Sequence, residues 1–371
     1  MQSKRILLMH ISNISGHRVA SLAIEKAIKT LSPTTRTMTL NAFNYVHPQG
    51  ERIVNFFYML MIQRLPFIWA HLYDNPFWVE KTQRLKETIH YFNLPKLEAL
   101  FNDFCPDAVV STQAFPCGMV ADFKRIKGAN LPLVAVLTDF VPHSYWIYDT
   151  VDYYIAPSEE VKQRFIGKGI SPERIKVLGI PFDPKFNQNL NKFETRKKLN
   201  LDSNLFTILI MGGSQGLGPI KKIVKILDNL SLNFQEIVVC GSNKRIYCWL
   251  KNRLTSFKKR IHLLGYTQNV EELMSAADII ITKPGGITCA EASSKGLPML
   301  IISPIPGQEA NNTSYLITQG SAIKLNSPFD LINIISDLYN HREKLKELSD
   351  AALKISKPNA AHDIARLLLD L

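Results

Sequence analysis

The sequence predicts an α/β protein of two doubly wound domains that face a cleft, and three observations lead to this prediction. The chain has 371 residues, the length of about two average domains. Short apolar runs alternate with amphipathic helical windows, as in parallel sheets covered by helices on both faces. A polar stretch rich in Asn and Lys, residues 183–204, separates two such series. We therefore expect domains at 1–182 and 205–371, joined by this linker, with ligands at the carboxyl ends of the strands.

Each element is expected from its own apolar pattern. In the first domain, strands are predicted at 5–9, 108–111, 133–137 and 152–156, and helices at 15–31, 76–104 and 159–168. In the second domain, strands are predicted at 206–211, 236–240, 261–264, 278–282 and 299–302, and helices at 219–230, 270–277 and 287–295. The last helix of the chain can pack back on the first domain.

Composition and charge limit the function classes. The five cysteines lack the spacing of a metal site or disulfide framework, so we expect free thiols in a reducing, cytoplasmic compartment. The formal net charge of +12 divides into +5 over residues 1–180 and +7 over 181–371. We interpret this as a diffuse positive surface that suits an anionic membrane, with no nucleic-acid partner. The apolar run 6–9 is too short for a signal peptide, and polar residues interrupt 53–72, so no membrane span is expected.

The first motif suited to ligand binding is a glycine-rich loop, residues 211–218 (MGGSQGLG), between a predicted strand and a predicted helix. Glycines allow main-chain N–H groups to approach a diphosphate, and the amino terminus of the helix adds partial positive charge. The loop is not a Walker A motif, because no Gly-Lys-Ser/Thr follows, and its spacing is not that of a dinucleotide fingerprint. By itself it is equally compatible with a tight structural turn.

Two further loops after predicted strands carry polar groups. At 282–292 (TKPGGITCAEA), a Pro-Gly-Gly turn leads into a helix with Glu291, a carboxylate suited to both hydroxyls of a ribose. At 304–312 (PIPGQEANN), amide and carboxylate side chains supply the donors and acceptors that a sugar ring requires. The alternatives are that Glu291 only complements the helix dipole and that the second loop only caps a helix.

Together, KPGGIT with a Glu three positions later, and PGQE followed by Asn, resemble the motifs of bacterial and plant lipid glycosyltransferases. These include the processive diacylglycerol glucosyltransferases and the monogalactosyldiacylglycerol synthases, relatives of the peptidoglycan N-acetylglucosaminyltransferase. The similarity extends from Ile6 to Leu325. It implies two Rossmann-like domains of the GT-B type, a UDP-glucose or UDP-galactose donor, diacylglycerol as the acceptor and inversion at the anomeric carbon.

Carried over by position, the resemblance assigns the donor contacts to the second domain. It places Glu291 on the ribose. It places Gln308, Glu309 and Asn312 on the hexose, Gly265 and Tyr266 at the uracil, and Gly213, Ser214, Gly216, Gly285 and Gly286 around the diphosphate. Segment 211–220 is closer to the galactosyl branch, whereas KPGGIT is closer to the glucosyl branch, so the donor sugar stays open.

In the first domain, the resemblance makes His17 the candidate general base. Displacement at an anomeric carbon needs a base for the acceptor hydroxyl proton, and a loop histidine suits neutral pH. The family has a Gly-Gly-Gly-His-Arg run here, whereas this chain has NISGHR at 13–18, so most of the glycines are replaced. Asp139, in a Thr-Asp-Phe segment that also matches, is expected to orient His17 or the acceptor. The structural alternatives are a capping role for each residue.

A second departure from the family is Asp183, which stands where arginine is usual. An acidic group would repel a diphosphate, so either Lys185 substitutes for the arginine or the contact is lost. The chain has no Asp-x-Asp motif. We therefore expect no cofactor and no metal, with main-chain amides and helix dipoles stabilising the leaving UDP.

An aromatic stretch at 53–78, with Arg52, Arg64 and Lys81 at its margins, is typical of a segment that lies among lipid headgroups. The alternative is core packing of two helices. We expect a peripheral protein on the cytoplasmic face of the cell membrane, acting as an inverting hexosyltransferase (EC 2.4.1 type) in glycolipid biosynthesis. Three alternatives remain open: N-acetylglucosaminyl transfer to a peptidoglycan lipid precursor, a UDP-sugar epimerase, and a non-catalytic UDP-sugar sensor.

Overall fold

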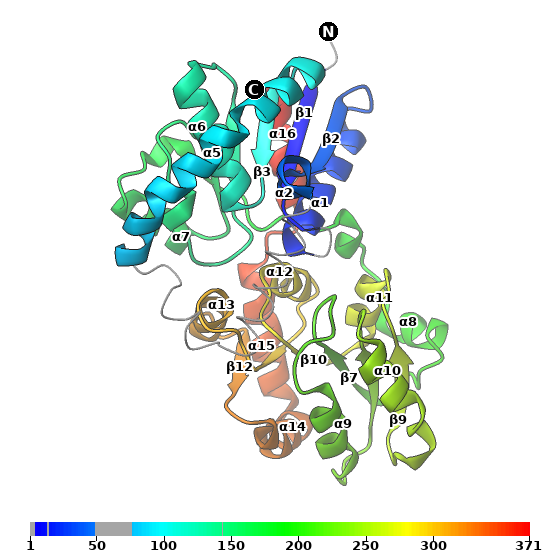
Figure 1. The fold of residues 1–371 in the computed structure, drawn as a ribbon. Helices are drawn as coiled ribbons and strands as arrows, with labels where there is room; N and C mark the ends of the chain where they lie inside the picture. Colours follow the sequence, from blue (N-terminus) through cyan, green and yellow to red (C-terminus); the bar gives the residue numbers. More distant parts are fainter. Residues whose placement is uncertain (1–3, 13–14, 49–75, 143) are drawn as a thin grey trace. The chain divides into compact units, whose positions relative to one another are not determined.

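The computed structural model describes residues 4–12, 15–48, 76–142 and 144–371, and Figure 1 shows the chain as a ribbon. The chain divides into two compact units. The first consists of 1–184, 305–308 and 357–371, and the second consists of 185–304 and 309–356. Each unit is built on its own parallel sheet of six strands, as the alternating pattern predicts.

The first sheet has the strand order β2-β1-β3-β4-β5-β6. Its strands are β1 (Arg5–His10), β2 (Arg36–Asn41), β3 (Ala108–Ser111), β4 (Leu133–Val136), β5 (Tyr153–Ala156) and β6 (Ile175–Val177). The register places Leu7 beside Met38 on one side and Val109 on the other. β3 and β4 are buried along their whole length, which explains why continuous apolar runs encode them.

Helices cover both faces of this sheet. They are α1 (Gly16–Leu31), α2 (Ala42–Val46), α5 (Pro76–Phe104), α6 (Ala114–Lys127), α7 (Glu159–Gly167) and α16 (Ala360–Asp370). Ile6 and Leu8 pack with α1 and α16 on one face, and Leu7 and Met9 pack with α5 and α6 on the other. The last helix, α16, lies beside α1 (Figure 1) and thus belongs to the first unit.

The second sheet has the strand order β12-β11-β10-β7-β8-β9. Its strands are β7 (Phe206–Met211), β8 (Phe234–Val239), β9 (Arg260–Leu264), β10 (Ile279–Thr282), β11 (Met299–Ile302) and β12 (Ala322–Leu325). The helices are α8 (Lys192–Lys198), α9 (Ile220–Asp228), α10 (Lys244–Lys251), α11 (Val270–Ala276), α12 (Gly286–Ser294), α13 (Gln308–Thr318), α14 (Leu331–Asn340) and α15 (Arg342–Ile355). Ile208, Ile210 and Val238 form a buried core with residues of α9, α10 and α14.

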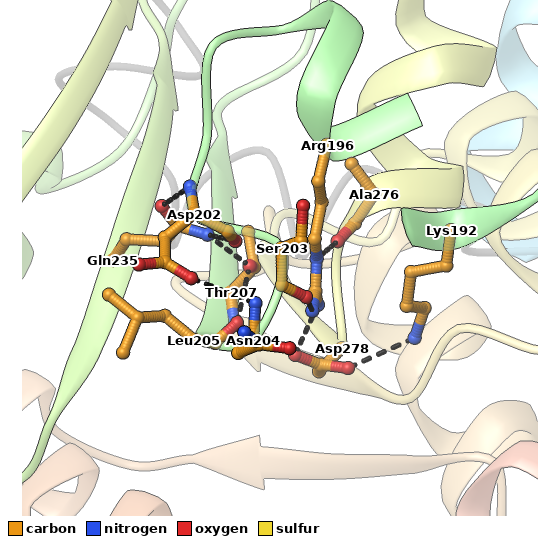
Figure 2. Close-up of polar contacts among 10 residues, drawn as sticks. All are labelled: Lys192, Arg196, Asp202, Ser203, Asn204, Leu205, Thr207, Gln235, Ala276 and Asp278. Carbon is orange, nitrogen blue, oxygen red and sulfur yellow. Dashed lines mark hydrogen bonds and ion pairs between the residues drawn. The ribbon is translucent and has the colours of Figure 1, made fainter. Parts of the chain in front are cut away.

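The predicted linker, 183–204, contains α8 and belongs almost entirely to the second unit. Arg196 of α8 is 5% exposed, donates to the Ala276 carbonyl at 2.8 Å and pairs with Asp278 at 2.7 Å. Asp278 also accepts the N–H of Thr207, the second residue of β7, at 2.7 Å. Figure 2 shows how this network fastens α8 to the amino-terminal edge of the sheet. Ala276 and Asp278 lie about 80 residues from Arg196 in sequence, so the local composition identifies the segment only as polar.

Three strands were not predicted, and all three are sheet edges: β2, β6 and β12. Edge strands are partly solvated and carry polar residues, which blunts pairing with other chains. β2, for example, has the sequence RTMTLN, and none of its residues is fully buried. Such strands lack the apolar run on which the prediction depends.

The described residues can be compared with the expectations for membrane-spanning helices and for cysteines. Within the described ranges, no helix is both long enough and apolar enough to span a membrane. The five cysteines are free thiols, with Cys105 and Cys248 exposed and the other three buried. The aromatic stretch at 53–78 lies outside the described residues up to position 75.

Candidate functional site

Each sheet has a topological switch point, where the strand order reverses. It lies between β1 and β3 in the first sheet and between β7 and β10 in the second. In doubly wound folds, ligands bind at the carboxyl ends of the strands that flank such a point. His17 follows β1, and the two glycine motifs, 212–218 and 283–286, follow β7 and β10. The predicted site residues thus lie where this topology favours binding.

His17 is half-buried in the first turn of α1. Its Nδ1 lies 2.7 Å from the main-chain carbonyl oxygen of Thr112, the residue that follows β3. A carbonyl oxygen only accepts hydrogen bonds, so Nδ1 carries the proton and Nε2 is the ring nitrogen left to act as a base. Thr112 Oγ1 also donates to the His17 carbonyl at 2.9 Å. Thr112 therefore fixes both the tautomer of His17 and the start of its helix.

The surroundings of His17 favour the neutral imidazole. Burial lowers the pKa of His17, and this effect outweighs the charge of Asp139 and the hydrogen bond to Thr112, both of which raise it. Thr138 Oγ1 lies 3.1 Å from Nδ1 of His17 and 3.5 Å from a carboxylate oxygen of Asp139. A neutral imidazole can accept a proton, and a nearby carboxylate can stabilise the imidazolium that results.

Asp139 is half-buried in the loop that follows β4 (Leu133–Val136). The segment 305–308 belongs to the first unit, and there the Gln308 carboxamide donates a hydrogen bond to the Asp139 carboxylate. The structure thus brings together His17, Asp139 and Gln308, although the resemblance assigns Gln308 to the hexose. Gln308 contacts the carboxylate that raises the pKa of His17.

Ser15 stands at one of the positions where the family has glycine, and its side chain has a structural role there. It is the N-cap of α1, and its hydroxyl accepts the Arg18 N–H at 3.4 Å and donates to the Ile11 carbonyl at 2.7 Å. A glycine can form neither of these side-chain bonds. At this position the chain therefore has a side chain that fixes the start of the helix in place of a flexible main chain.

The loop 212–218 requires glycine at specific positions. Gly213, Gly216 and Gly218 have φ angles of 69°, 58° and 95°, which disfavour other residues. A Cβ on Gly216 would lie 2.0 Å from the carbonyl oxygen of Cys240, whereas one on Gly213 would meet nothing within 4 Å. The Ser214 carbonyl accepts the N–H of Ser242 at 2.9 Å. The loop therefore packs tightly on the loop that follows β8, while the space where a Cβ on Gly213 would point is open.

The second glycine motif forms the amino terminus of α12. Gly285 is its N-cap, makes no side-chain capping bond, and has open space where a Cβ would point. The first N–H groups of a helix lack partners within the helix and favour an anion. Gly286 begins α12, and Glu291 lies further along it with 9% exposure. This helix can therefore present main-chain donors at its start and a carboxylate one to two turns later.

Lys283 lies beside the glycine-rich loop, and its position in the sequence did not predict a role for it. Its Nζ lies 3.2 Å from Glu309 Oε2, and both side chains are largely buried. Its aliphatic carbons are the nearest atoms to a Cβ built on Gly218. A lysine directly before Pro-Gly-Gly was the signal that could have revealed it. It places a cation beside the loop expected to hold the diphosphate.

Asn312 is fully buried, and its side chain donates to the Pro284 carbonyl at 3.0 Å. It therefore holds the Pro-Gly-Gly turn in position from α13. Gly265 and Tyr266 lie in the loop after the edge strand β9, where Tyr266 is 67% exposed and a Cβ on Gly265 would meet nothing. That loop is open, as a site for a flat base requires.

Asp183 and Lys185 have separate partners. Asp183 pairs with Lys26 of α1 at 2.7 Å, within the first unit. Lys185 pairs with Glu271 at 2.7 Å and donates to the Gln268 carbonyl, within the second unit. The negative charge of Asp183 thus has a counter-ion of its own, and Lys185 is held by a carboxylate.

A cavity of about 560 Å³ lies at the amino-terminal ends of the strands in the second unit, away from the glycine motifs. Its lining residues precede β10 and β11 or come from segments 186–192 and 345–353. None of the predicted site residues lines it. Because doubly wound folds bind ligands at strand carboxyl ends, we do not place the donor there.

Comparisons with known proteins agree with these motifs. Residues 17–182 match the family model of monogalactosyldiacylglycerol (MGDG) synthase. Residues 207–366 match the model of the glycosyltransferase family 28 C-terminal domain. Each half of the chain therefore matches a glycosyltransferase family independently.

Relatives match over nearly the whole chain. A processive diacylglycerol beta-glucosyltransferase of Bacillus pumilus is 30% identical over 358 residues, covering 93% of this chain and 89% of that protein. The chloroplastic monogalactosyldiacylglycerol synthase 3 of Arabidopsis thaliana is 30% identical over 378 residues, covering 98% and 80%.

Solved structures share the fold at low identity. MurG of Acinetobacter baumannii superposes with a TM-score of 0.64 at 15% identity, over 99% of this chain and 100% of that one. A UDP-GlcNAc 2-epimerase from Neisseria meningitidis gives the same TM-score, identity and coverage. These likenesses confirm two Rossmann-like domains of the GT-B type. With the full-length relatives, they show that the chain belongs to the family of the processive diacylglycerol glucosyltransferases and monogalactosyldiacylglycerol synthases.

Proposed function

We propose that this protein transfers a hexose from a UDP-sugar to diacylglycerol with inversion at the anomeric carbon. The observation that carries the proposal is the state of His17, a neutral imidazole whose Nδ1 is bonded to a carbonyl and whose Nε2 is left as a base. In a member of this family, such a group has a clear task, which is to accept the proton of the glycerol hydroxyl.

In the proposed reaction, Nε2 of His17 takes the hydroxyl proton while the oxygen attacks the anomeric carbon. The bond from that carbon to the β-phosphate oxygen breaks, and UDP leaves with the electron pair. Main-chain N–H groups around Gly213 and Ser214 and at the start of α12 stabilise the leaving diphosphate, with Lys283 as a nearby cation. Asp139 stabilises the imidazolium that forms. It is a positioning residue, because it acts through His17.

The remaining donor contacts are proposed from the resemblance and the placement of each residue. Glu291 binds the ribose hydroxyls, Gln308 and Glu309 face the hexose, and the loop at Gly265 and Tyr266 receives the uracil. Asn312 acts indirectly, because its amide is bonded to the Pro284 carbonyl. The donor is UDP-glucose or UDP-galactose, and no metal is needed because amides and Lys283 supply the positive charge. Addition of EDTA should leave the rate unchanged, and a loss restored by Mg²⁺ would refute this part.

The direct test supplies purified protein with labelled UDP-glucose or UDP-galactose, each with and without diacylglycerol in vesicles. We expect UDP release that depends on diacylglycerol and a labelled glycolipid from one of the two donors. A soluble isomeric sugar would instead indicate the epimerase. Donor binding without UDP release would indicate the sensor, an alternative motivated by Asp183 and the shortened glycine run.

A pH profile tests the role of His17 more closely. The rate should fall on the acid side as His17 becomes protonated, and because burial lowers its pKa, this limb should lie below the usual value near 6.5. The charge of Asp139 raises the pKa of His17, so Asp139→Asn should move the limb of kcat/KM to still lower pH. A limb that stays in place in Asp139→Asn would exclude this coupling.

A further inference from the structure

The positive charge of this protein is concentrated in one segment. Residues 221–260 contain ten Lys and Arg against two acidic residues, which gives +8 of the +12 net charge of the chain. The expectation of a diffuse positive surface therefore does not describe the second unit. The segment forms α9, β8, α10 and the start of β9. The basic face, as we call it, consists of Lys221, Lys222, Lys225, Lys244, Arg245, Lys251, Arg253, Lys258, Lys259 and Arg260.

These ten cations are not neutralised by the protein. Eight are exposed and two are half-buried, and none forms an ion pair with any carboxylate among the described residues. Of the two acidic residues, Glu236 is fully buried. Asp228 accepts the main-chain N–H groups of Lys258 and Lys259, at 2.6 and 3.0 Å. Many lysines elsewhere, such as Lys192 and Lys198, are paired with carboxylates.

An aromatic side chain lies among these cations. The Trp249 ring of α10 is half-buried, and Lys225 of α9 and Arg253 lie 5.2 and 4.8 Å from its centroid. Lys221 lies 5.1 Å from the same ring. α9 and α10 lie side by side in Figure 1, and cations from α9 and from the residues after α10 thus surround one indole. Cations around a half-buried tryptophan are typical of a surface that meets lipid headgroups.

We propose that the basic face of the second unit docks the protein on an anionic lipid surface. The choice of a lipid rests on the proposed function, because an acceptor such as diacylglycerol resides in a bilayer. Charge complementarity supplies the attraction: ten unpaired cations face the negative potential of anionic headgroups, which decays within a Debye length of the membrane. The sequence pattern placed membrane contact in the other unit, at 53–78.

The test measures binding of the full chain to vesicles of phosphatidylcholine alone and of phosphatidylcholine mixed with phosphatidylglycerol. We expect binding to the mixed vesicles, weakened as salt rises from about 0.1 M to about 1 M. The variant Lys225→Glu/Lys251→Glu/Arg253→Glu replaces three cations by carboxylates. At about fivefold in partition per surface cation, the loss of the three cations alone should weaken binding by about 100-fold, and repulsion of the new carboxylates should weaken it further.

The matched control is Lys324→Glu/Lys346→Glu/Lys354→Glu, which changes the net charge equally at exposed positions of the same unit, outside the basic face. It should retain most of the binding. Equal loss in both variants would show a net-charge effect and overturn the proposal, as would wild-type binding that ignores phosphatidylglycerol. Tighter binding of duplex DNA than of the mixed vesicles, at equal salt, would assign the face to nucleic acid instead.

Activity in micelles of an uncharged detergent separates this inference from the proposed function. None of the three altered residues belongs to the candidate site, so glycolipid formation in such micelles should be unchanged in the basic-face variant. If the wild-type protein binds mixed vesicles but forms no glycolipid in micelles, the proposed function fails while the docking surface stands. If it forms glycolipid but does not bind the vesicles, the reverse holds.

Discussion

The two units share one architecture but prepare their switch points by different means. In the first unit, the feature that matters is a side chain, His17, whose pKa is lowered by burial against the charge of Asp139 and the hydrogen bond to Thr112. In the second unit, it is the path of the main chain: Gly216 lies where no side chain fits, and Gly285 begins α12 without a side-chain cap. We therefore expect the loss of a functional group to lower activity most in the first unit, and added side-chain volume to weaken donor binding in the second.

The largest effect is expected in the first unit. His17→Ala removes the proposed base and should lower kcat by about 10²- to 10⁴-fold, while donor binding, which we propose to reside in the second unit, should change little. Rates of UDP release and calorimetric titration with UDP measure the two quantities separately. A comparable loss of UDP binding would mean that the division of labour between the units is wrong.

The network that attaches α8 to the second sheet should be the next most sensitive to substitution. Arg196→Met takes a buried guanidinium from the Ala276 carbonyl and from half-buried Asp278, which keeps Lys192 as a partner at 3.0 Å, so it should cost about 1–3 kcal/mol of unfolding free energy. Lys198→Met, which removes an exposed partner of Glu272, is the matched control and should cost below about 1 kcal/mol. Denaturant unfolding followed by circular dichroism measures both. Equal losses of unfolding free energy in both variants would show that the bond between Arg196 and Asp278 does not hold α8 on the second sheet.

A glycine pair tests whether volume governs the donor loop. Gly213 and Gly216 both have positive φ, so replacing either by alanine introduces similar backbone strain. Only at Gly216 would the new Cβ meet a carbonyl oxygen, at 2.0 Å. We expect Gly216→Ala to cost about 1–3 kcal/mol more than Gly213→Ala, and to weaken UDP binding more, because the loop must move. Thermal unfolding and titration with UDP would check the order, and the opposite order would contradict the proposed loop geometry.

The smallest effect concerns Glu236, a core residue of the second unit whose two carboxylate oxygens have no hydrogen-bond partner. Burial raises the pKa of Glu236, and so does the charge of Asp228, whereas the charge of Lys259 has a smaller, lowering effect. The unfolded chain therefore loses this proton at lower pH than the folded protein, and stability falls as pH rises above the unfolded value of about 4.3.

Glu236→Gln removes this titration, so its stabilising effect should grow from near zero at about pH 4 to about 1 kcal/mol or more at about pH 8. Exposed Glu347→Gln is the control and should show no such trend. Unfolding by urea across this pH range measures both variants. A Glu236→Gln effect that does not change with pH would show that the carboxyl group is not held neutral by burial.

The central strands and the loops that follow them could be predicted from local sequence. Strands such as β3, β4, β7 and β10 are buried on both faces, so each reads as a continuous apolar run, and a motif written directly after such a run is placed at a strand end. That is why 212–218, 283–286 and His17 could be named before any contact was known. The short-range pattern carries this information because strand burial and loop position are local properties.

The edge strands, the place of α8 and the tautomer of His17 depend on contacts that form only in the folded protein. The edge strands β2, β6 and β12 depend on a neighbour that supplies hydrogen bonds, and α8 belongs to the second unit because Arg196 reaches Asp278, 82 residues away. The tautomer of His17 depends on Thr112, 95 residues away. The physical reason is common to all of them: hydrogen bonds, desolvation and ion pairing depend on distance in space, and only the folded chain brings the partners together.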